Sequence, residues 1–155
     1  MESTAVARSA SSSTGNHAVA RRFAEFIQQE PTTGEGLIRK VREGYPAVLV
    51  KQAGDYFKVP EKRLCDILGV SASTLHRRST QQTPLDPAAS ERMHRIAILT
   101  REALDIFGDE ERAREWLLRP NHALSEAAPL DLLDTEIGTT AVRRVLAAIA
   151  EGGAV

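Results

Sequence analysis

The sequence contains a single cysteine, Cys65, and this scarcity excludes an internal disulfide. It also indicates a reducing compartment, because disulfides accumulate in proteins of oxidising compartments. A lone cysteine cannot supply a Cys-x-x-Cys metal site, and the four histidines are scattered along the chain at positions 17, 76, 94 and 122. We therefore expect no metal site.

Motifs of common enzyme chemistry are also missing. The sequence has no G-x-S-x-G nucleophile elbow, no phosphate-binding P-loop and no G-x-G-x-x-G after a strand. Asp131, Asp134 and Glu136 lie close together, but carboxylates on a short exposed helix usually serve solvation or favour the helix start. Ser71 and His76 are five residues apart and do not face each other well on a helix. We expect no catalytic residues, no cofactor and no enzyme activity.

Long apolar stretches are absent as well. No run approaches the roughly 18 residues that a membrane-spanning helix requires. The N-terminal segment MESTAVARSASSSTGNHA lacks the apolar region of a secretory signal. We therefore expect a cytoplasmic protein without a membrane partner.

Aromatic residues make up only 5% of the chain, whereas alanine and leucine are abundant. This composition favours helices over sheets, which are enriched in β-branched and aromatic residues. Apolar residues recur at helical spacing, between capping residues at the start and Gly or Pro at the end. No segment has the pattern of a strand, so the sequence predicts an all-α fold of roughly eight helices.

The predicted helices divide the chain into three parts. Residues 1–15 are rich in Ser, Thr and Ala without periodicity, and we expect a disordered tail there. Residues 16–107 begin with a helix capped by Asn16 and end with the longest helix, 86–107, which is apolar on more than one face. Such a helix packs against two elements at once. We expect it to join this domain to a small helical domain at 108–155.

Residues 68–78, LGVSASTLHRR, have the pattern of a DNA-binding helix-turn-helix. Gly69 tolerates the left-handed backbone conformation that ends the first helix. Val70 is the apolar residue that fills the turn between the two helices, and Ser71 caps the second helix. Leu75 ties the second helix to the core, and Cys65 is a small residue where the two helices approach. A second helix held in this way can enter the major groove of DNA.

The polar residues of the second helix face outward if Ala72 and Leu75 face inward. Hydroxyls and arginines are the side chains that contact phosphates and the guanine edge. Arg78 departs from the pattern, because many such motifs have an apolar residue there, and we expect a helix that is held less firmly. The candidate DNA-binding residues are Ser71, Ser73, Thr74, His76, Arg77 and Arg78, with Lys62 before the turn and Lys58 and Arg63 as further backbone contacts.

The net charge of −1 hides an asymmetry between the two halves. Residues 37–80 carry nine Lys/Arg against four Asp/Glu, whereas residues 105–155 carry five against ten. The first half suits a polyanionic partner and the second a basic one. An ordinary helical corner with a solvated basic face remains the alternative to a DNA-binding motif.

Three segments of the second half, EWLLRPNHAL, PLDLLDTEIG and AVRRVLAAIAEG, follow one another in order. This series resembles the toxin-binding domain of the MbcA/ParS/Xre antitoxins. LGVSASTLHRR and the long helix beginning DPAASERMHRI resemble the Xre/Cro-like helix-turn-helix half of the same antitoxins. The resemblance covers roughly residues 37–153 and leaves the first 36 residues outside.

The resemblance implies a homodimeric two-domain antitoxin. Such antitoxins bind a RES-domain toxin, whose family consumes NAD, and block its active site. They also bind operator DNA and repress their own operon together with the toxin. On this basis we place the toxin interface at Gly138, Arg143, Arg144, Glu151, Gly152, Gly153 and Val155.

Two other functions remain open at this point. The chain can be a stand-alone helix-turn-helix repressor without a toxin partner, or an adaptor whose corner contacts protein. Composition alone favours a solvated face for Arg143 and Arg144. The apolar residues between Trp116 and Leu133 are expected to form the core of the small domain.

Overall fold

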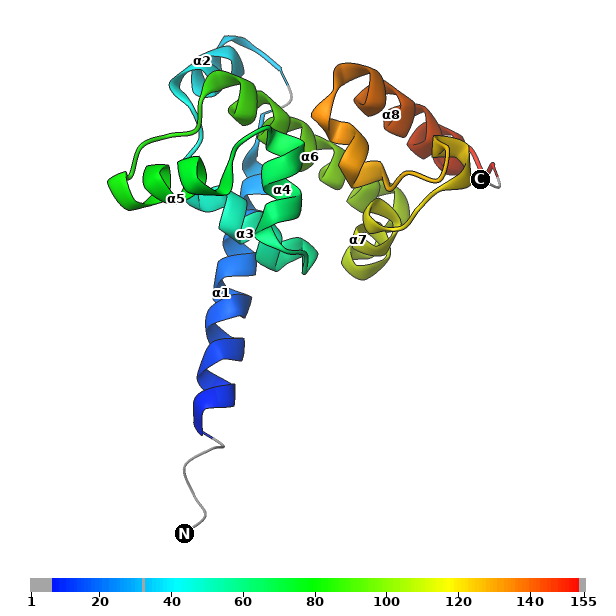
Figure 1. Ribbon diagram of the computed structural model, residues 1–155. Coiled ribbons are helices and arrows are strands. Elements are labelled where there is room, and N and C mark those ends of the chain that lie inside the picture. Colours follow the sequence, from blue (N-terminus) through cyan, green and yellow to red (C-terminus); the bar gives the residue numbers. More distant parts are fainter. Residues whose placement is uncertain (1–6, 32, 154–155) are drawn as a thin grey trace.

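The computed structural model describes residues 7–31 and 33–153. This part of the chain contains helices and no strand, which confirms the predicted all-α fold (Figure 1). Two isolated backbone bridges, Pro46–Pro84 and Asn121–Ala127, are the only β-type pairs among these residues. The elements are α1 (Ala7–Gln29), α2 (Glu35–Glu43), α3 (Val48–Phe57), α4 (Glu61–Leu68), α5 (Ala72–Gln81), α6 (Pro87–Phe107), α7 (Glu110–Leu118), the 3-10 helices η1 (His122–Leu124) and η2 (Pro129–Asp134), and α8 (Glu136–Ala150).

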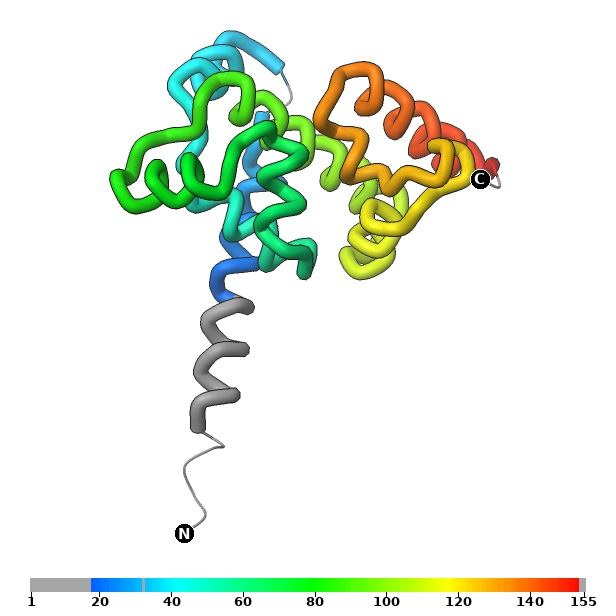
Figure 2. The backbone as a smooth tube through the Cα atoms, in the orientation of Figure 1, coloured from blue at the N-terminus to red at the C-terminus, as the bar shows by residue number. Residues whose placement is uncertain are grey.

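Helix α6 joins the two halves of the molecule (Figure 2). The carboxylate of Asp86 accepts a hydrogen bond from the amide of Ala89 at 2.9 Å, Pro87 occupies the first turn, and Gly108 ends the helix at φ 64°. Its sides contact α1, α2 and α4 in the N-terminal half and α7, η2 and α8 in the C-terminal half. The predicted two-sided packing of this helix is confirmed.

Aromatic side chains form the core between α1 and α3. The ring of Phe23 lies 5.4 Å from that of Tyr56 and 5.9 Å from that of Phe57, centroid to centroid. Leu64 of α4 and Leu75 of α5 are buried in the same core cluster. The two helices of the corner are therefore anchored to a core that α1 completes.

The start of α1 differs from the prediction. We expected a helix capped by Asn16, but α1 already begins at Ala7 and Asn16 lies within it. No proline interrupts residues 7–29, and the helix continues through Gly15. The short polar residues that suggested a tail therefore extend the helix. Residues 1–6 of the expected tail lie outside the described residues.

The C-terminal half shares one continuous apolar core with the N-terminal half, where the sequence predicted a core of its own. Trp116 and Leu132 lie at its edge, and the indole of Trp116 packs on the ring of Phe107 at 5.8 Å. The residues buried in this half include Leu117, Leu124, Leu130, Leu133, Val142, Val145 and Leu146.

Helix α8 begins at Glu136. The Thr135 hydroxyl accepts a hydrogen bond from the amide of Gly138 at 3.0 Å and caps the helix. A Cβ at Gly138 would clash with the carbonyl oxygen of Leu132. Glycine at this position therefore lets η2 and α8 approach each other closely.

No helix within the described ranges is both long and apolar enough to cross a membrane. The same ranges contain no group of three His, Cys, Asp or Glu side chains placed to hold a metal ion.

Candidate binding surfaces

The turn between α4 and α5 has the predicted geometry. Gly69 adopts the left-handed conformation at φ 68°, and Val70 is buried beside it. The Ser71 hydroxyl accepts a hydrogen bond from the amide of Thr74 at 3.1 Å, so Ser71 is the N-cap of α5. Leu75 and Cys65 are both 3% exposed. The residues that were expected to build the corner do build it.

The prediction that Ala72 faces inward is wrong. Ala72 is exposed, because it occupies the first turn of α5, which lies outside the core. Leu75 is the single buried residue of this helix. The helix is therefore attached to the core at one point and presents most of its circumference to solvent.

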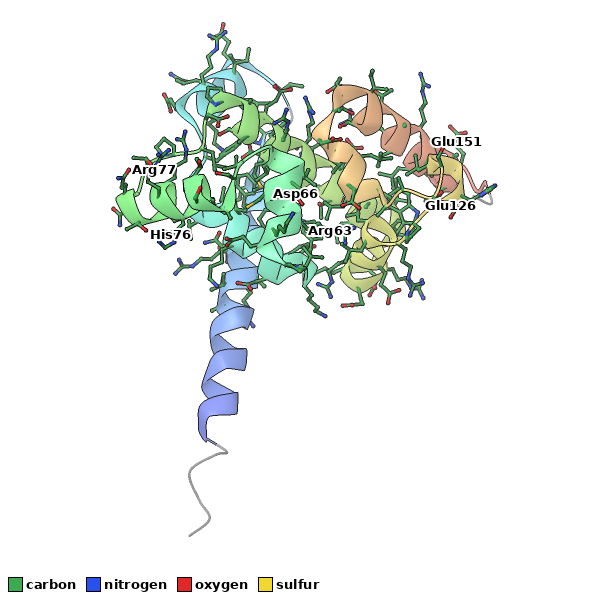
Figure 3. All side chains as sticks on the ribbon, viewed as in Figure 1. Arg63, Asp66, His76, Arg77, Glu126 and Glu151 are labelled. Carbon is green, nitrogen blue, oxygen red and sulfur yellow. The ribbon has the colours of Figure 1, made fainter. Side chains whose placement is uncertain are left out.

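The candidate DNA-binding residues differ in how freely they can contact a ligand. Ser73, His76 and Arg77 are exposed, and Figure 3 shows His76 and Arg77 on the part of α5 that lies away from the C-terminal half. Thr74 is half-buried, and its hydroxyl accepts a hydrogen bond from the Ser71 hydroxyl at 2.9 Å. Ser71 and Thr74 thus serve the cap, whereas His76 and Arg77 extend from the helix.

Lysine and arginine side chains before the turn already have partners within the chain. The Lys62 ammonium lies 2.8 Å from the carboxylate of Asp66, and this hydrogen bond raises the pKa of Lys62. Lys58 lies 3.7 Å from Glu111 on α7, and Arg63 pairs with Asp131 on η2. A phosphate would have to compete with these carboxylates.

Arg78 is half-buried and points back toward the protein. Its guanidinium donates a hydrogen bond to the carbonyl oxygen of Pro84. This bond connects the end of α5 to the loop before α6, while Leu75 remains the single buried residue of the helix, so the expectation that α5 is held less firmly stays a prediction. Arg78 therefore makes a contact within the chain rather than an outward one.

Helix α8 carries two opposite faces. Its buried residues are Thr139, Val142, Val145 and Leu146, which recur at helical spacing. Ile137 lies off this stripe and is 85% exposed, the largest exposed fraction among the exposed large hydrophobic residues of the described chain. Arg144 and Glu151 are exposed and lie seven and fourteen residues further on, which places them on the same side as Ile137.

The candidate toxin-binding residues fall into two groups. Gly138 and Arg143 contact the rest of the chain: Gly138 packs against Leu132, and the Arg143 guanidinium pairs with Glu102 on α6 at 3.1 Å. Of the others, Arg144 lies in the middle of α8, and the rest follow its last residue, Ala150. Arg144, Glu151, Gly152 and Gly153 are exposed, and Val155 lies outside the described residues.

Sequence reasoning missed Ile137. The signal was present, because Ile137 does not share the spacing of the four buried residues of α8. A single exposed isoleucine is common on protein surfaces, so Ile137 is a candidate partner contact only because it lies on the same side of α8 as the exposed Arg144.

A buried polar cluster at the end of α1 was missed as well. The Glu30 carboxylate accepts hydrogen bonds from the Tyr45 hydroxyl, from Lys40 Nζ at 2.9 Å and contacts His94 Nδ1 at 3.2 Å. Burial by itself raises the pKa of Glu30, but these hydrogen bonds outweigh it and hold the pKa below its usual range. Burial and Glu30 together raise the pKa of Tyr45. The cluster joins the end of α1 to α2 and α6, with Glu30 buried and the Lys40 side chain 47% exposed.

Two family models match the chain in the order of its two halves. Residues 36–97 match the antitoxin Xre-like helix-turn-helix domain, and residues 102–152 match the antitoxin Xre/MbcA/ParS C-terminal toxin-binding domain. Together with the fold, these matches define a class: a helical antitoxin with a DNA-binding domain and a toxin-binding domain.

Curated relatives agree with this class. An Antitoxin Xre of Pseudomonas putida is 38% identical over 79 residues, which is 51% of this chain and 50% of that protein. An Antitoxin Xre of Photorhabdus laumondii is 26% identical over 122 residues, 78% of this chain and 82% of that one. A Prs ADP-ribosylating antitoxin of a Sphingobium species is 30% identical over 139 residues, 84% and 86% of the two chains. The chain belongs to the Xre/MbcA/ParS antitoxin family, and its function is that of a toxin-neutralising antitoxin with a DNA-binding domain.

Proposed function

We propose that the chain neutralises a RES-type, NAD-consuming toxin by blocking its active site, and that it binds operator DNA as a homodimer to repress its own operon. The observation that carries the proposal is the separation of two surfaces: α5 and α8 lie at opposite ends of the molecule (Figure 1). A toxin on α8 and DNA on α5 can therefore be bound at the same time.

The toxin surface of this proposal is the outward side of α8 with the chain that follows it. Ile137 supplies an apolar contact, while Arg144, Glu151 and residues 152–155 supply the remaining ones. Gly138 and Arg143 take a different role, because their contacts within the chain hold α8 in place.

Two observations support an NAD-consuming toxin. The name of the Sphingobium relative refers to ADP-ribosylation, a reaction that consumes NAD. The toxin pocket must bind the phosphates of NAD and should be basic, and residues 105–155 of this chain carry ten Asp/Glu against five Lys/Arg. Opposite charges of this kind accelerate association and fix its orientation.

The DNA surface of the proposal is the outer side of α5. His76 and Arg77 reach out of the helix, and an arginine can contact the O6/N7 edge of guanine with two hydrogen bonds. Helix-turn-helix proteins of this kind bind as dimers to two half-sites that lie about one helical turn apart. A homodimer is therefore suited to bind a palindromic operator.

The test uses the full chain, the product of the gene adjacent to its own and a DNA fragment with the promoter of its own gene. We expect a stable complex that stops NAD consumption by the toxin, and DNA binding that weakens steeply as salt rises. Absence of a complex would overturn toxin neutralisation. Operator binding without any toxin complex would instead identify a stand-alone repressor, and binding without salt dependence would exclude phosphate contacts.

A further inference from the structure

A pocket of about 550 Å³ lies where α1, α3 and the turn between α6 and α7 meet. Its floor is apolar, because Ala24 and Leu104 are half-buried and Tyr56 is only 2% exposed. Of the described residues of α5 and α8, none lines this pocket. The pocket is therefore distinct from the two proposed binding surfaces.

The rim of the pocket carries charge of one sign. The described residues that line it include no lysine, arginine or histidine, but they include the carboxylates of Glu25, Asp105, Asp109 and Glu110. Charges of one sign around a concave, partly apolar surface raise the local concentration of the opposite charge. The pocket therefore favours a cation.

Two of these carboxylates are already engaged within the chain. Glu110 lies 3.5 Å from the guanidinium of Arg114, and Asp109 accepts a hydrogen bond from the amide of Arg112 as the N-cap of α7. Glu25 on α1 and Asp105 on α6 are exposed and form no ion pair within residues 7–31 and 33–153. Both can therefore pair with a ligand.

The hydroxyl of Tyr56 is an independent observation that points to a ligand. Burial and the nearby Glu110 raise the pKa of Tyr56 to about 12, so the hydroxyl keeps its proton. No hydrogen bond to another described side chain contributes to this shift. Since buried polar groups nearly always have a hydrogen-bond partner, a ligand in the pocket would supply the missing one.

Two arginines that do not line the pocket hold its walls in place. Arg101 on α6 fixes the end of α1, because it donates to the carbonyl oxygens of Ile27 and Glu30 at 3.3 and 2.7 Å. Arg114 on α7 donates to the carbonyl oxygen of Tyr56 at 3.2 Å and so fixes the end of α3. The pocket is therefore formed before a ligand arrives, as small-ligand sites usually are.

The arrangement also selects the kind of cation. Within the part of the chain that the structure describes, no three carboxylates are placed to hold a metal ion. Separated carboxylates over an apolar floor suit a cation with an aliphatic stem, which packs its carbon chain on the floor and keeps its charge at the rim.

We propose that this pocket binds an aliphatic amine or guanidinium, supplied either by a free polyamine or by a lysine or arginine side chain of a protein partner. Asp105 and Glu25 pair with the positive charge, and the Tyr56 hydroxyl accepts a hydrogen bond from it. The inference goes beyond the proposed function and does not depend on it.

The test titrates the full chain with spermidine and, separately, with L-arginine amide at about 0.15 M salt, where unspecific attraction between exposed charges is screened. We expect saturable binding of at least one probe at a single site. The backbone amide of Gly108, which lines the pocket, should shift in nitrogen–proton correlation spectra. The amide of Gly69, in the corner between α4 and α5, should not shift.

Asp105→Lys places a competing ammonium in the pocket. It should weaken binding of the probe by at least about tenfold, because like charges then meet at the contact. The matched control is Glu43→Lys, which makes the same change of charge at an exposed position of α2 outside the pocket. The control should bind the probe as the unaltered chain does.

Tyr56→Phe separates a ligand contact from a structural role. The ring remains, with its contacts to Phe23 and Phe57 at 5.4 and 5.0 Å between centroids, and only the hydroxyl is lost. Probe binding should weaken roughly threefold, the effect of one hydrogen bond. The melting temperature should stay equal or rise, whereas a purely structural role of the hydroxyl would lower it and leave probe binding unchanged.

The source of the cation is found with the product of the adjacent gene. If its affinity falls in Asp105→Lys but not in Glu43→Lys, the pocket takes a basic side chain of that protein. If its affinity is the same in both variants while spermidine binds at Gly108, the pocket takes a free amine. Both results support the inference.

Three results would overturn the inference. The first is that neither probe binds and Asp105→Lys keeps the affinity of the unaltered chain for the product of the adjacent gene. The second is equal loss in Asp105→Lys and Glu43→Lys, because net charge would then explain the binding. The third is an equal shift of Gly108 with Mg²⁺ at the same concentration. Probe binding at Gly108 in a chain that binds neither toxin nor DNA would overturn the proposed function alone.

Discussion

Arg143 on α8 and Glu102 on α6 form a forked ion pair, in which Nε of Arg143 lies 3.1 Å from both carboxylate oxygens of Glu102. The neighbouring Arg144 is exposed and has no such partner among the described residues. Two adjacent arginines that look equivalent in the sequence therefore have different roles. One fastens α8 to the long helix, and the other faces outward.

This difference predicts opposite results for two charge reversals. Arg144→Glu removes an outward guanidinium, with its hydrogen-bond donors, from the proposed contact, so toxin binding should weaken by roughly tenfold or more, and the melting temperature should stay unchanged. Arg143→Glu should lower the stability by up to about 1 kcal/mol, because the pair is partly exposed. Isothermal calorimetry and thermal melts of both variants test this. Equal effects on toxin binding would contradict the assignment.

Ile137 should be an anchor of the toxin complex. Ile137→Ser removes an apolar contact worth about 1.5–3 kcal/mol if the side chain is fully buried by the partner, and toxin affinity should fall roughly tenfold to a hundredfold. Ile38→Ser is the matched control, since Ile38 on α2 is 53% exposed and lies in the other half. If both variants bind toxin as the unaltered chain does, the α8 surface is not the interface.

Alanine substitution should have different effects at Arg77 and at Arg78. Arg77→Ala should weaken DNA binding and reduce its salt dependence while the melting temperature stays constant. Arg78→Ala should lower the melting temperature, because the carbonyl of Pro84 loses its donor. Replacing both should abolish operator binding and leave toxin neutralisation in place. Loss of both activities would point to a wrong domain assignment.

Gly138→Ala should destabilise the fold. The added methyl group meets the carbonyl of Leu132, and such overpacking costs about 1–3 kcal/mol. Gly36→Ala is the control: a Cβ at Gly36, in α2, meets nothing within 4 Å, so alanine should leave stability equal or higher. Chemical denaturation of the two variants gives the comparison, and equal stabilities would contradict a close approach of η2 and α8.

The Glu30 cluster should give the fold an acid-sensitive contribution. Hydrogen bonds hold the folded-state pKa of Glu30 below its ordinary value of 4.5. The stabilisation is therefore complete above pH 4.5 and is lost as the pH falls below 4.5 toward the folded-state pKa. Glu30→Gln should lower stability at neutral pH and flatten its decline in acid. Glu25→Gln, on the exposed side of α1, should leave the profile unchanged.

The corner could be predicted because its signals are local. Gly69, Val70, Ser71 and Leu75 lie within seven residues, and each has a conformational or burial preference that is visible in the sequence. The order of helices and the apolar faces of α6 and α8 follow from spacing in the same way.

The contacts that distinguish one arginine from another could not be predicted. Arg63 and Asp131 are 68 residues apart, and Arg92 meets backbone carbonyls, which have no sequence signature. The partner of Arg78, the carbonyl of Pro84, could not be predicted for the same reason. Ala72 was misplaced because one turn of a short helix carries too few positions to define a face.

Helix α6 contributes buried residues to the cores of both halves. Neither half can unfold without exposing an apolar side of this helix, so the chain should persist or be degraded as a unit. A protease that destroys the antitoxin would then free the toxin and the promoter in the same event.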